Sequence, residues 1–142
     1  MNSAVQREFN CETEAVKSRI VNYWSARSDS FMTQREAELQ SGQHQIWARE
    51  LLSHLHGKTG LRILDVGCGC GFFSLLLAEN GHHVTGIDLT EDMVLHSREL
   101  ARQHGIRAEF FQMDAEYPAF PDEIFDVVVS RNLTWTLPHP AE

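Results

Sequence analysis

Four short apolar runs alternate with two helix-forming stretches through the second half of the chain. The runs have the length of strands that are buried on both faces of a sheet. They cover residues 61–66, 83–87, 108–112 and 125–129. Helix-forming residues occupy positions 72–80 and 91–104, and Gly81 and Gly105 stand where C-terminal caps are expected. Strands joined by helical crossovers predict an α/β fold with a doubly wound parallel sheet.

The first part of the chain has a helical pattern instead. Apolar residues recur at helical spacing over residues 12–27 and again over residues 33–56, where the pattern is interrupted at residues 41–42. We expect residues 1–10 to be frayed and residues 28–30 to separate the two helical segments. The pattern therefore divides the chain into an N-terminal helical lid or cap region and an α/β core. These two parts are residues 1–57 and residues 58–142.

Three glycines at alternate positions, Gly67, Gly69 and Gly71, follow the first apolar run. Without Cβ atoms, this backbone can turn sharply and lie against a ligand, and the first amides of the helix that follows point at that ligand. A dinucleotide-binding turn usually has the spacing G-x-G-x-x-G. The spacing here is G-x-G-x-G, which disfavours a nucleotide-binding oxidoreductase domain.

Acidic residues stand at or near the ends of the first three predicted strands, at Asp65, Asp88 and Asp114. Ligands of such sheets bind beyond the carboxyl ends of the strands, so these acids are expected at one site. Asp88 lies 21 residues after Gly67, close to the spacing of about 20 expected for an acid that accepts hydrogen bonds from ribose hydroxyls. The spacing favours this interpretation over a simple acid at a helix N-terminus.

The pattern Asp-x-Gly-x-Gly-x-Gly over residues 65–71, with the downstream acids in order, resembles the first motifs of the class I S-adenosylmethionine (SAM)-dependent methyltransferases. The resemblance is to their small-molecule group (methyltransferase type 11/25-like) and covers roughly residues 20 to 138. It implies a Rossmann-like core, SAM as cofactor with S-adenosylhomocysteine (SAH) as product, and direct methyl transfer to a small-molecule acceptor. The alternative is a non-catalytic SAM- or SAH-binding module, or a fragment that needs a partner chain. No catalytic residue is indicated.

The resemblance also assigns cofactor contacts residue by residue. Asp65 orders the turn and approaches the methionine ammonium group, and Asp88 binds the ribose. Asp114 and the backbone amide of Ala115 bind the adenine edge. Leu89 and Met93 flank the adenine ring, although Met93 equally fits core packing. The complete expected cofactor-binding set is Asp65, Gly67, Cys68, Gly69, Gly71, Asp88, Leu89, Met93, Asp114, Ala115, Arg131, Asn132, Tyr23 and Arg27.

Two flanking segments carry the remaining expectations. The stretch Y-W-x-x-R, residues 23–27, looks like the N-terminal segment of these small-molecule methyltransferases, where a lid helix closes on the SAM carboxylate through Tyr and Arg. A surface helix with an exposed Arg27 fits the pattern equally well. Arg131 and Asn132 follow the fourth run, where the family has cofactor neighbours. Trp135 either walls the acceptor pocket or packs on the sheet edge.

The family sheet has further strands, whereas this chain ends shortly after the fourth run. We therefore expect a truncated homologue or a fragment. Its fourth strand, F-D-V-V-V over residues 125–129, is too apolar for an exposed edge. The expected consequence is a homo-oligomer, such as a dimer, that covers this edge.

The formal net charge of -8 disfavours nucleic acid as a partner. Three cysteines form no disulfide framework and indicate a reducing, cytoplasmic location. They also lack a second Cys/His pair at zinc spacing, so no metal site is expected. The N-terminus has no signal-peptide pattern, and no apolar run approaches the roughly 18 residues of a membrane span. These features favour a protein that acts on small molecules.

Overall fold

The computed structural model describes the backbone of residues 3–141 and the side chains of residue 7 and of residues 10–141. Three helices precede a mixed region of strands and helices. The elements are α1 (Ser3–Ser25), α2 (Ser28–Leu39), α3 (Gly42–Ser53), β1 (Arg62–Val66), α4 (Phe72–Glu79), β2 (His83–Asp88), α5 (Glu91–His104), β3 (Glu109–Gln112), β4 (Val127–Ser130) and the short 3-10 helix η1 (Thr134–Thr136). All four predicted strands and both core helices are thus confirmed.

The four strands form one parallel sheet in the order β3-β2-β1-β4. The chain adds β2 and β3 on one side of β1 and then returns to add β4 on the other. This reversal is the topological switch point of a doubly wound sheet, beside which ligands of such folds bind. The register pairs Val66 with both Ile87 and Ser130, so the carboxyl ends of the strands meet at one edge of the sheet.

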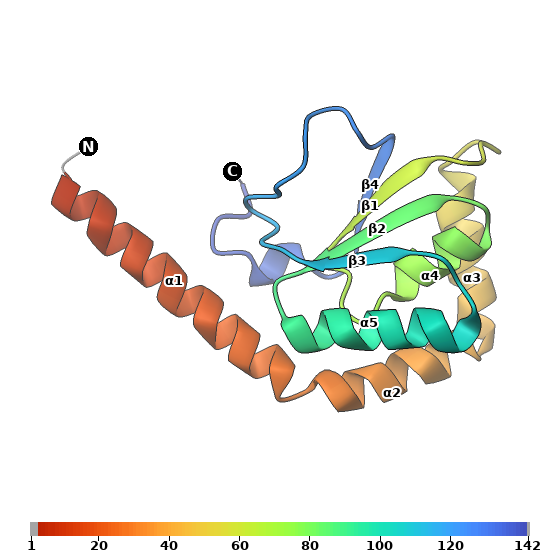
Figure 1. Cartoon of the computed structure of the whole chain (residues 1–142), viewed down its shortest axis with the longest axis horizontal. Coiled ribbons are helices and arrows are strands. Elements are labelled where there is room, and N and C mark those ends of the chain that lie inside the picture. Colours follow the sequence, from red (N-terminus) through yellow and green to blue (C-terminus); the bar gives the residue numbers. More distant parts are fainter. Residues whose placement is uncertain (1–2, 142) are drawn as a thin grey trace.

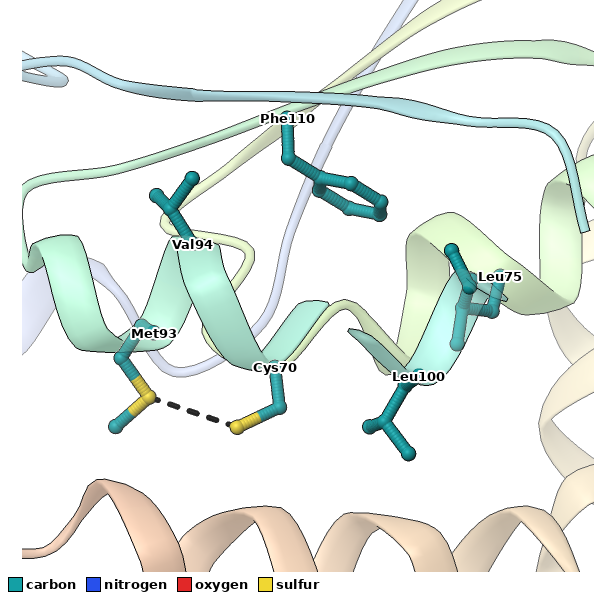
Figure 2. Packing of buried hydrophobic residues seen from close by; sticks show 7 residues of the cluster. Cys70, Leu75, Met93, Val94, Leu100 and Phe110 are labelled. Atoms are coloured by element: carbon teal, nitrogen blue, oxygen red, sulfur yellow. Dashed lines mark hydrogen bonds between the residues drawn. The ribbon is translucent and has the colours of Figure 1, made fainter. Parts of the chain in front are cut away.

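Helices α4 and α5 lie on the same face of the sheet, and α2 and α3 pack against them (Figure 1). Helix α1 extends away from this layer toward the carboxyl ends of the strands (Figure 1). The cluster in Figure 2 fills the space beneath β3, where Cys70 Sγ lies 3.6 Å from Met93 Sδ and both side chains are fully buried. This packing fixes the start of α5 against the turn that follows β1.

Two boundaries in the N-terminal region differ from the prediction. Residues 1–10 were expected to be frayed, but residues 3–10 belong to α1; residues 1–2 lie outside the described part. Residues 28–30 were expected to separate two helices, but the chain turns at residues 26–27 and Ser28 begins α2. Ser28 is buried and its hydroxyl donates to the Ser25 carbonyl over 3.0 Å, so this serine satisfies a carbonyl at the end of α1.

Two other boundaries depend on side-chain hydrogen bonds. The interruption expected at residues 41–42 is confirmed, because the Ser41 hydroxyl caps α3 by accepting from the Gln43 amide over 3.2 Å. Strand β4 begins at Val127 instead of residue 125. The Asp126 carboxylate bonds the backbone amide and the guanidinium of Arg62, which anchors the chain immediately before the strand. Among the described helices, none is long and apolar enough to cross a membrane.

Candidate functional site

The turn between β1 and α4 holds three glycines in left-handed backbone conformations. The φ angles of Gly67, Gly69 and Gly71 are 68°, 55° and 84°, a region that residues with a Cβ rarely adopt. A Cβ at Gly67 would lie 2.6 Å from Cδ1 of Leu133, and one at Gly71 would lie 3.0 Å from Cε1 of Phe110. The missing side chains therefore allow the loop after β4 and the core beneath β3 to close on this turn.

Asp88, at the end of β2, joins the turn to the start of α5. Its Oδ2 accepts from the Gly69 amide and its Oδ1 from the Thr90 amide, each over 2.9 Å. Burial raises the pKa of Asp88 above its usual value, and the two amide bonds offset this only in part. Each carboxylate oxygen has more than one acceptor position. Asp88 can therefore hold the turn and still accept hydrogen bonds from a ligand.

Asp65 has a different environment at the end of β1. It is buried, and its Oδ2 accepts from the Ser74 hydroxyl over 2.6 Å. Burial raises the pKa of Asp65 to about 6; the Ser74 hydrogen bonds lower it and the charge of Asp88 raises it further. This carboxyl group ties β1 to α4.

The two cysteines of the turn keep their protons. Burial, followed by the charges of Asp65, Asp88 and Cys70, raises the pKa of Cys68 well above its usual value. Burial and the charge of Asp88 raise the pKa of Cys70 to about 12. Thiols of this kind are poor nucleophiles and poor metal ligands. Within residues 10–141, no three His, Cys, Asp or Glu side chains gather as metal ligands either.

A cavity of about 260 Å³ opens at the carboxyl ends of the strands, beside the turn. Most of the residues that the sequence indicated contribute to its lining. They are Asp65, Gly67, Cys68, Gly69, Asp88, Leu89, Met93, Asp114, Ala115, Arg131 and Asn132. The fold thus brings residues from the ends of β1, β2, β3 and β4 to one concave site, which is the usual form of a small-molecule site.

Three expected residues lie outside the cavity lining. The Gly71 amide donates to the Cys68 carbonyl over 2.9 Å, and this residue begins α4 behind the turn. The Arg27 guanidinium lies 3.8 Å from the centre of the Tyr23 ring, and Tyr23 is 47% exposed. These two side chains stack on each other at the end of α1, and neither lines the cavity.

Lys17 of α1 reaches the cavity although the sequence analysis did not select it. Its Nζ lies 2.6 Å from Asp114 Oδ2 and 2.8 Å from Glu116 Oε2, and its side chain is only 8% exposed. Burial lowers the pKa of Lys17, but the bonds and charges of the two acids outweigh burial and raise it to about 12. Lys17 precedes Ile20 and Trp24 by three and seven residues. That helical spacing was the signal that could have placed it on the inner face.

Aromatic side chains from three segments line the opening of the cavity. Trp24 of α1 contacts Phe31 of α2 and Trp135 of η1, with ring centres 5.5 and 6.4 Å apart. Trp135 is 69% exposed and lines the cavity. Of the two alternatives for Trp135, the structure therefore favours the cavity wall over packing on the sheet edge. The sequence analysis placed Trp24 only on the apolar face of the first helix and assigned no role to Phe31.

Comparisons with known proteins agree with this geometry. The family model described as a methyltransferase domain matches residues 63–142. The chain is 40% identical over 87 residues to the ubiquinone biosynthesis O-methyltransferase of Aeromonas salmonicida strain A449, covering 60% of this chain and 36% of that protein. It is 39% identical over 94 residues to the phosphatidylethanolamine N-methyltransferase of Cereibacter sphaeroides, covering 65% of this chain and 45% of that protein.

Among solved structures, magnesium protoporphyrin IX methyltransferase from Synechocystis PCC 6803 with bound SAM gives a TM-score of 0.67 at 20% identity, over 87% of this chain and 64% of that one. This likeness concerns the fold and confirms the expected Rossmann-like arrangement. The chain spans less than half the length of each of the two curated relatives. The family model nevertheless covers more than half of this chain, so the chain belongs to the methyltransferase domain family.

Proposed function

We propose that this chain binds SAM in the cavity beside the glycine turn and transfers the methyl group to a small-molecule acceptor. The observation that carries the proposal is the Asp88 carboxylate, which is held by the amides of Gly69 and Thr90 and lines the cavity. A carboxylate fixed in this way can accept both hydroxyls of a ribose. The named relatives are an O- and an N-methyltransferase, which supports methyl transfer without indicating the acceptor atom.

The rest of the cavity fits the two ends of such a cofactor. Leu89, Met93, Asp114 and Ala115 all line the cavity. We propose that the first two provide apolar surface for the adenine ring and that the last two bind its polar edge. Asp114 already accepts from Lys17 and from the Glu116 amide, and a carboxylate retains further acceptor positions for an adenine amino group. Gly67 and Gly69 line the same cavity, and we propose that the methionine part lies along the backbone of this turn.

The cofactor, when bound, supplies a methyl group on a positively charged sulfur and hence its own leaving group. The chain's contribution is then position and exclusion of water. Trp24, Phe31 and Trp135 surround the opening with aromatic surface, which can hold an acceptor and keep water out. The protonated thiols of Cys68 and Cys70 take no part in this step.

Calorimetric titration with SAH tests the proposal. We expect saturable binding by the wild type and a loss of about 10- to 100-fold in affinity for Asp88→Asn, because hydrogen bonds to a charged group are lost. Asp122→Asn, at an exposed loop acid, is the matched control and should bind as the wild type. The proposal would be contradicted if the folded wild type did not bind SAH, or if NAD competed for the site as strongly as SAH does. Binding without methyl transfer to any acceptor would favour the non-catalytic module.

Three further proposals concern the assembly, the cellular location and the substrate class of the protein. Within the part of the chain that the structure describes, strand β4 pairs only with β1 and lies at the edge of the sheet, and Val128 on it is 62% exposed. We propose that a second copy covers this edge, which a monomeric sedimentation coefficient at micromolar concentration would contradict. The free thiols, with Cys11 exposed, support a reducing cytoplasmic location, and the negative charge supports a small molecule over a nucleic acid as substrate.

A further inference from the structure

Lys17 of α1 joins two carboxylates at one side of the cavity. Its Nζ lies 2.6 Å from Oδ2 of Asp114 and 2.8 Å from Oε2 of Glu116. The side chains of Lys17 and Glu116 are each 8% exposed, whereas that of Asp114 is 26% exposed. Two acids held at one ammonium group would repel each other without it, because little water screens their charges there. Lys17 therefore allows the two acids to lie together.

The two acids face different parts of the structure. Oε1 of Glu116 accepts from the His139 amide over 2.8 Å, and Glu116 is not among the residues that line the cavity. Asp114 does line the cavity. Its Oδ1 accepts from the Glu116 amide over 3.0 Å, and its Oδ2 accepts from Lys17. Each oxygen of Asp114 thus has one partner in the protein and keeps a further acceptor position, so these bonds orient the carboxylate and leave it able to bind a ligand.

The docking of α1 fixes the position of Lys17 in turn. Ile20 and Trp24, one and two turns later on the same helix, line the cavity with it. The Lys17 Nζ also lies 5.0 Å from the centre of the Tyr117 ring, which is close enough for a cation–π contact. Because the helix is docked at this point, the ammonium group is held at Asp114 and is not free in solvent.

The orientation of Asp114 decides which purine the cavity can distinguish. Under the proposed function, Asp114 binds the polar edge of the adenine ring, where an amino group donates. A carboxylate only accepts hydrogen bonds, so it suits an amino group and offers no donor to a carbonyl oxygen at the same place. Without the ammonium group, repulsion by Glu116 would turn Asp114 away, and the site would lose this distinction. Lys17 thus affects the choice of base by acting through Asp114.

We propose that Lys17 is a positioning residue, which holds Asp114 toward the cavity and so makes the site prefer an amino-substituted purine to an oxo-substituted one. The identity of the ligand rests on the proposed function, whereas the hold on Asp114 rests on the contacts of Lys17 itself. Tyr23 and Arg27, the residues of this part of the chain that were expected at the cofactor, do not line the cavity.

The first arm of the test compares SAH with S-inosylhomocysteine, which carries a carbonyl oxygen in place of the adenine amino group. In calorimetry, we expect the wild type to prefer SAH by about 10- to 100-fold and Lys17→Met to reduce this preference to within about threefold. Lys17→Arg retains the charge and should keep most of the preference. Arg19→Met, which removes an exposed cation from the same helix, is the control. The proposal would be overturned if the wild type had no preference, if Lys17→Met left it unchanged, or if Lys17→Met bound SAH more tightly.

The second arm tests whether repulsion between the two acids is the cause. Glu116→Gln removes this repulsion, so combining it with Lys17→Met should restore the preference for SAH to within about threefold of the wild type. Lost packing of α1 would not be restored by the change at Glu116. A double variant that did not recover the preference would therefore show a merely structural role for Lys17 and overturn the proposal.

A third measurement separates this proposal from the proposed function. If the wild type binds neither compound, the proposed function fails, and the hold of Lys17 on Asp114 is measured in the ligand-free protein by a double-mutant cycle of Lys17→Met and Asp114→Asn. We expect the two changes to be coupled by about tenfold in the unfolding equilibrium constant. A coupling of this size would support the hold, and additive effects would overturn it.

Discussion

Two parts of the cavity, which we call its floor and its wall, are held by contacts between residues at very different separations along the sequence. The floor is the glycine turn with Asp88, whose bonds to Gly69 and Thr90 join residues 19 and 2 positions apart. The wall is made by Lys17 and by the pair of Glu38 with Arg131. Its bonds join residues 97 and 93 positions apart. The floor therefore depends on the local backbone, and the wall depends on ion pairs that form only when α1 and α2 dock.

The largest expected effect is on the unfolding free energy, and it distinguishes backbone strain from close packing as the reason for glycine in the floor. Gly71 and Gly105 both have left-handed φ angles, of 84° and 64°. A Cβ at Gly71 would meet Phe110, which Figure 2 shows within the buried cluster, whereas one at Gly105 meets nothing within 4 Å. Gly71→Ala should lower the unfolding free energy by about 2–5 kcal/mol, since strain of about 1–2 adds to overpacking of about 1–3.

Urea unfolding of both variants measures this difference. Gly105→Ala should cost only about 1–2 kcal/mol, because strain acts there without a steric contact. If the two alanine variants lost the same unfolding free energy, backbone strain alone would explain the need for glycine at position 71. Close packing against Phe110 would then contribute nothing to the stability of the turn.

The next largest effect is a dependence of the unfolding free energy on pH, which arises from Asp65 beside the glycine turn. Burial raises the pKa of Asp65 from 3.8 to about 6, so the folded protein binds a proton more tightly than the unfolded chain. The unfolding free energy should then fall by about 3 kcal/mol as the pH rises from about 4 to about 6. Asp65→Asn retains an acceptor for Ser74 but cannot ionise. The difference between wild type and variant, from urea unfolding at several pH values, should show this fall.

Asp126 provides a control of opposite sign. The Arg62 guanidinium and amide hold the pKa of this exposed acid down to about 2, so its stabilising contribution is present above pH 3.8 and is lost as the pH falls toward 2. The difference in unfolding free energy between the wild type and Asp126→Asn should therefore not change between pH 4 and pH 6. If this difference fell as much as the difference between the wild type and Asp65→Asn, Asp65 would not be the group responsible.

The same difference in sequence separation explains which features could be predicted from the sequence and which could not. The strands, the turn and the assignment of Asp88 follow from short patterns, because the residues involved lie within about 25 positions of one another. Arg35 belongs to no such pattern, and for Lys17 the helical spacing to Ile20 and Trp24 was the one local signal. Each reaches the cavity only when its helix docks on the core.

The assignment of Tyr23 and Arg27 illustrates the converse. A short pattern resembling a lid selected them, but the chain leaves α1 at residues 26–27, and the Arg27 side chain turns back onto the Tyr23 ring. The orientation of a side chain at a helix end depends on where the helix stops. The predicted helix extended to residue 27, two residues beyond the observed end at Ser25, and the Arg27 side chain lies outside the cavity lining.

The smallest expected effect tests whether ion pairs hold the wall. Lys17→Met leaves Asp114 and Glu116 without their cation and should lower the unfolding free energy by about 1–3 kcal/mol. Arg102→Met breaks an exposed, solvent-screened pair with Glu99 and should leave the unfolding free energy nearly unchanged. Because the pKa of Lys17 is raised to about 12, its contribution should persist from pH 7 to pH 10 and be lost only as the pH approaches 12.

Hydrogen exchange then shows where this stability is located. With Lys17 intact, the amides of α1 around residue 17 are protected by docking as well as by the helix itself. In Lys17→Met they should exchange faster, while those of α5, whose start is fixed by Asp88 and by the buried Met93, should keep their rates. Unchanged protection in α1 would mean that apolar contacts such as Trp24 with Phe31 hold the wall. Floor and wall would then differ in the range of their contacts but not in the kind of force that maintains them.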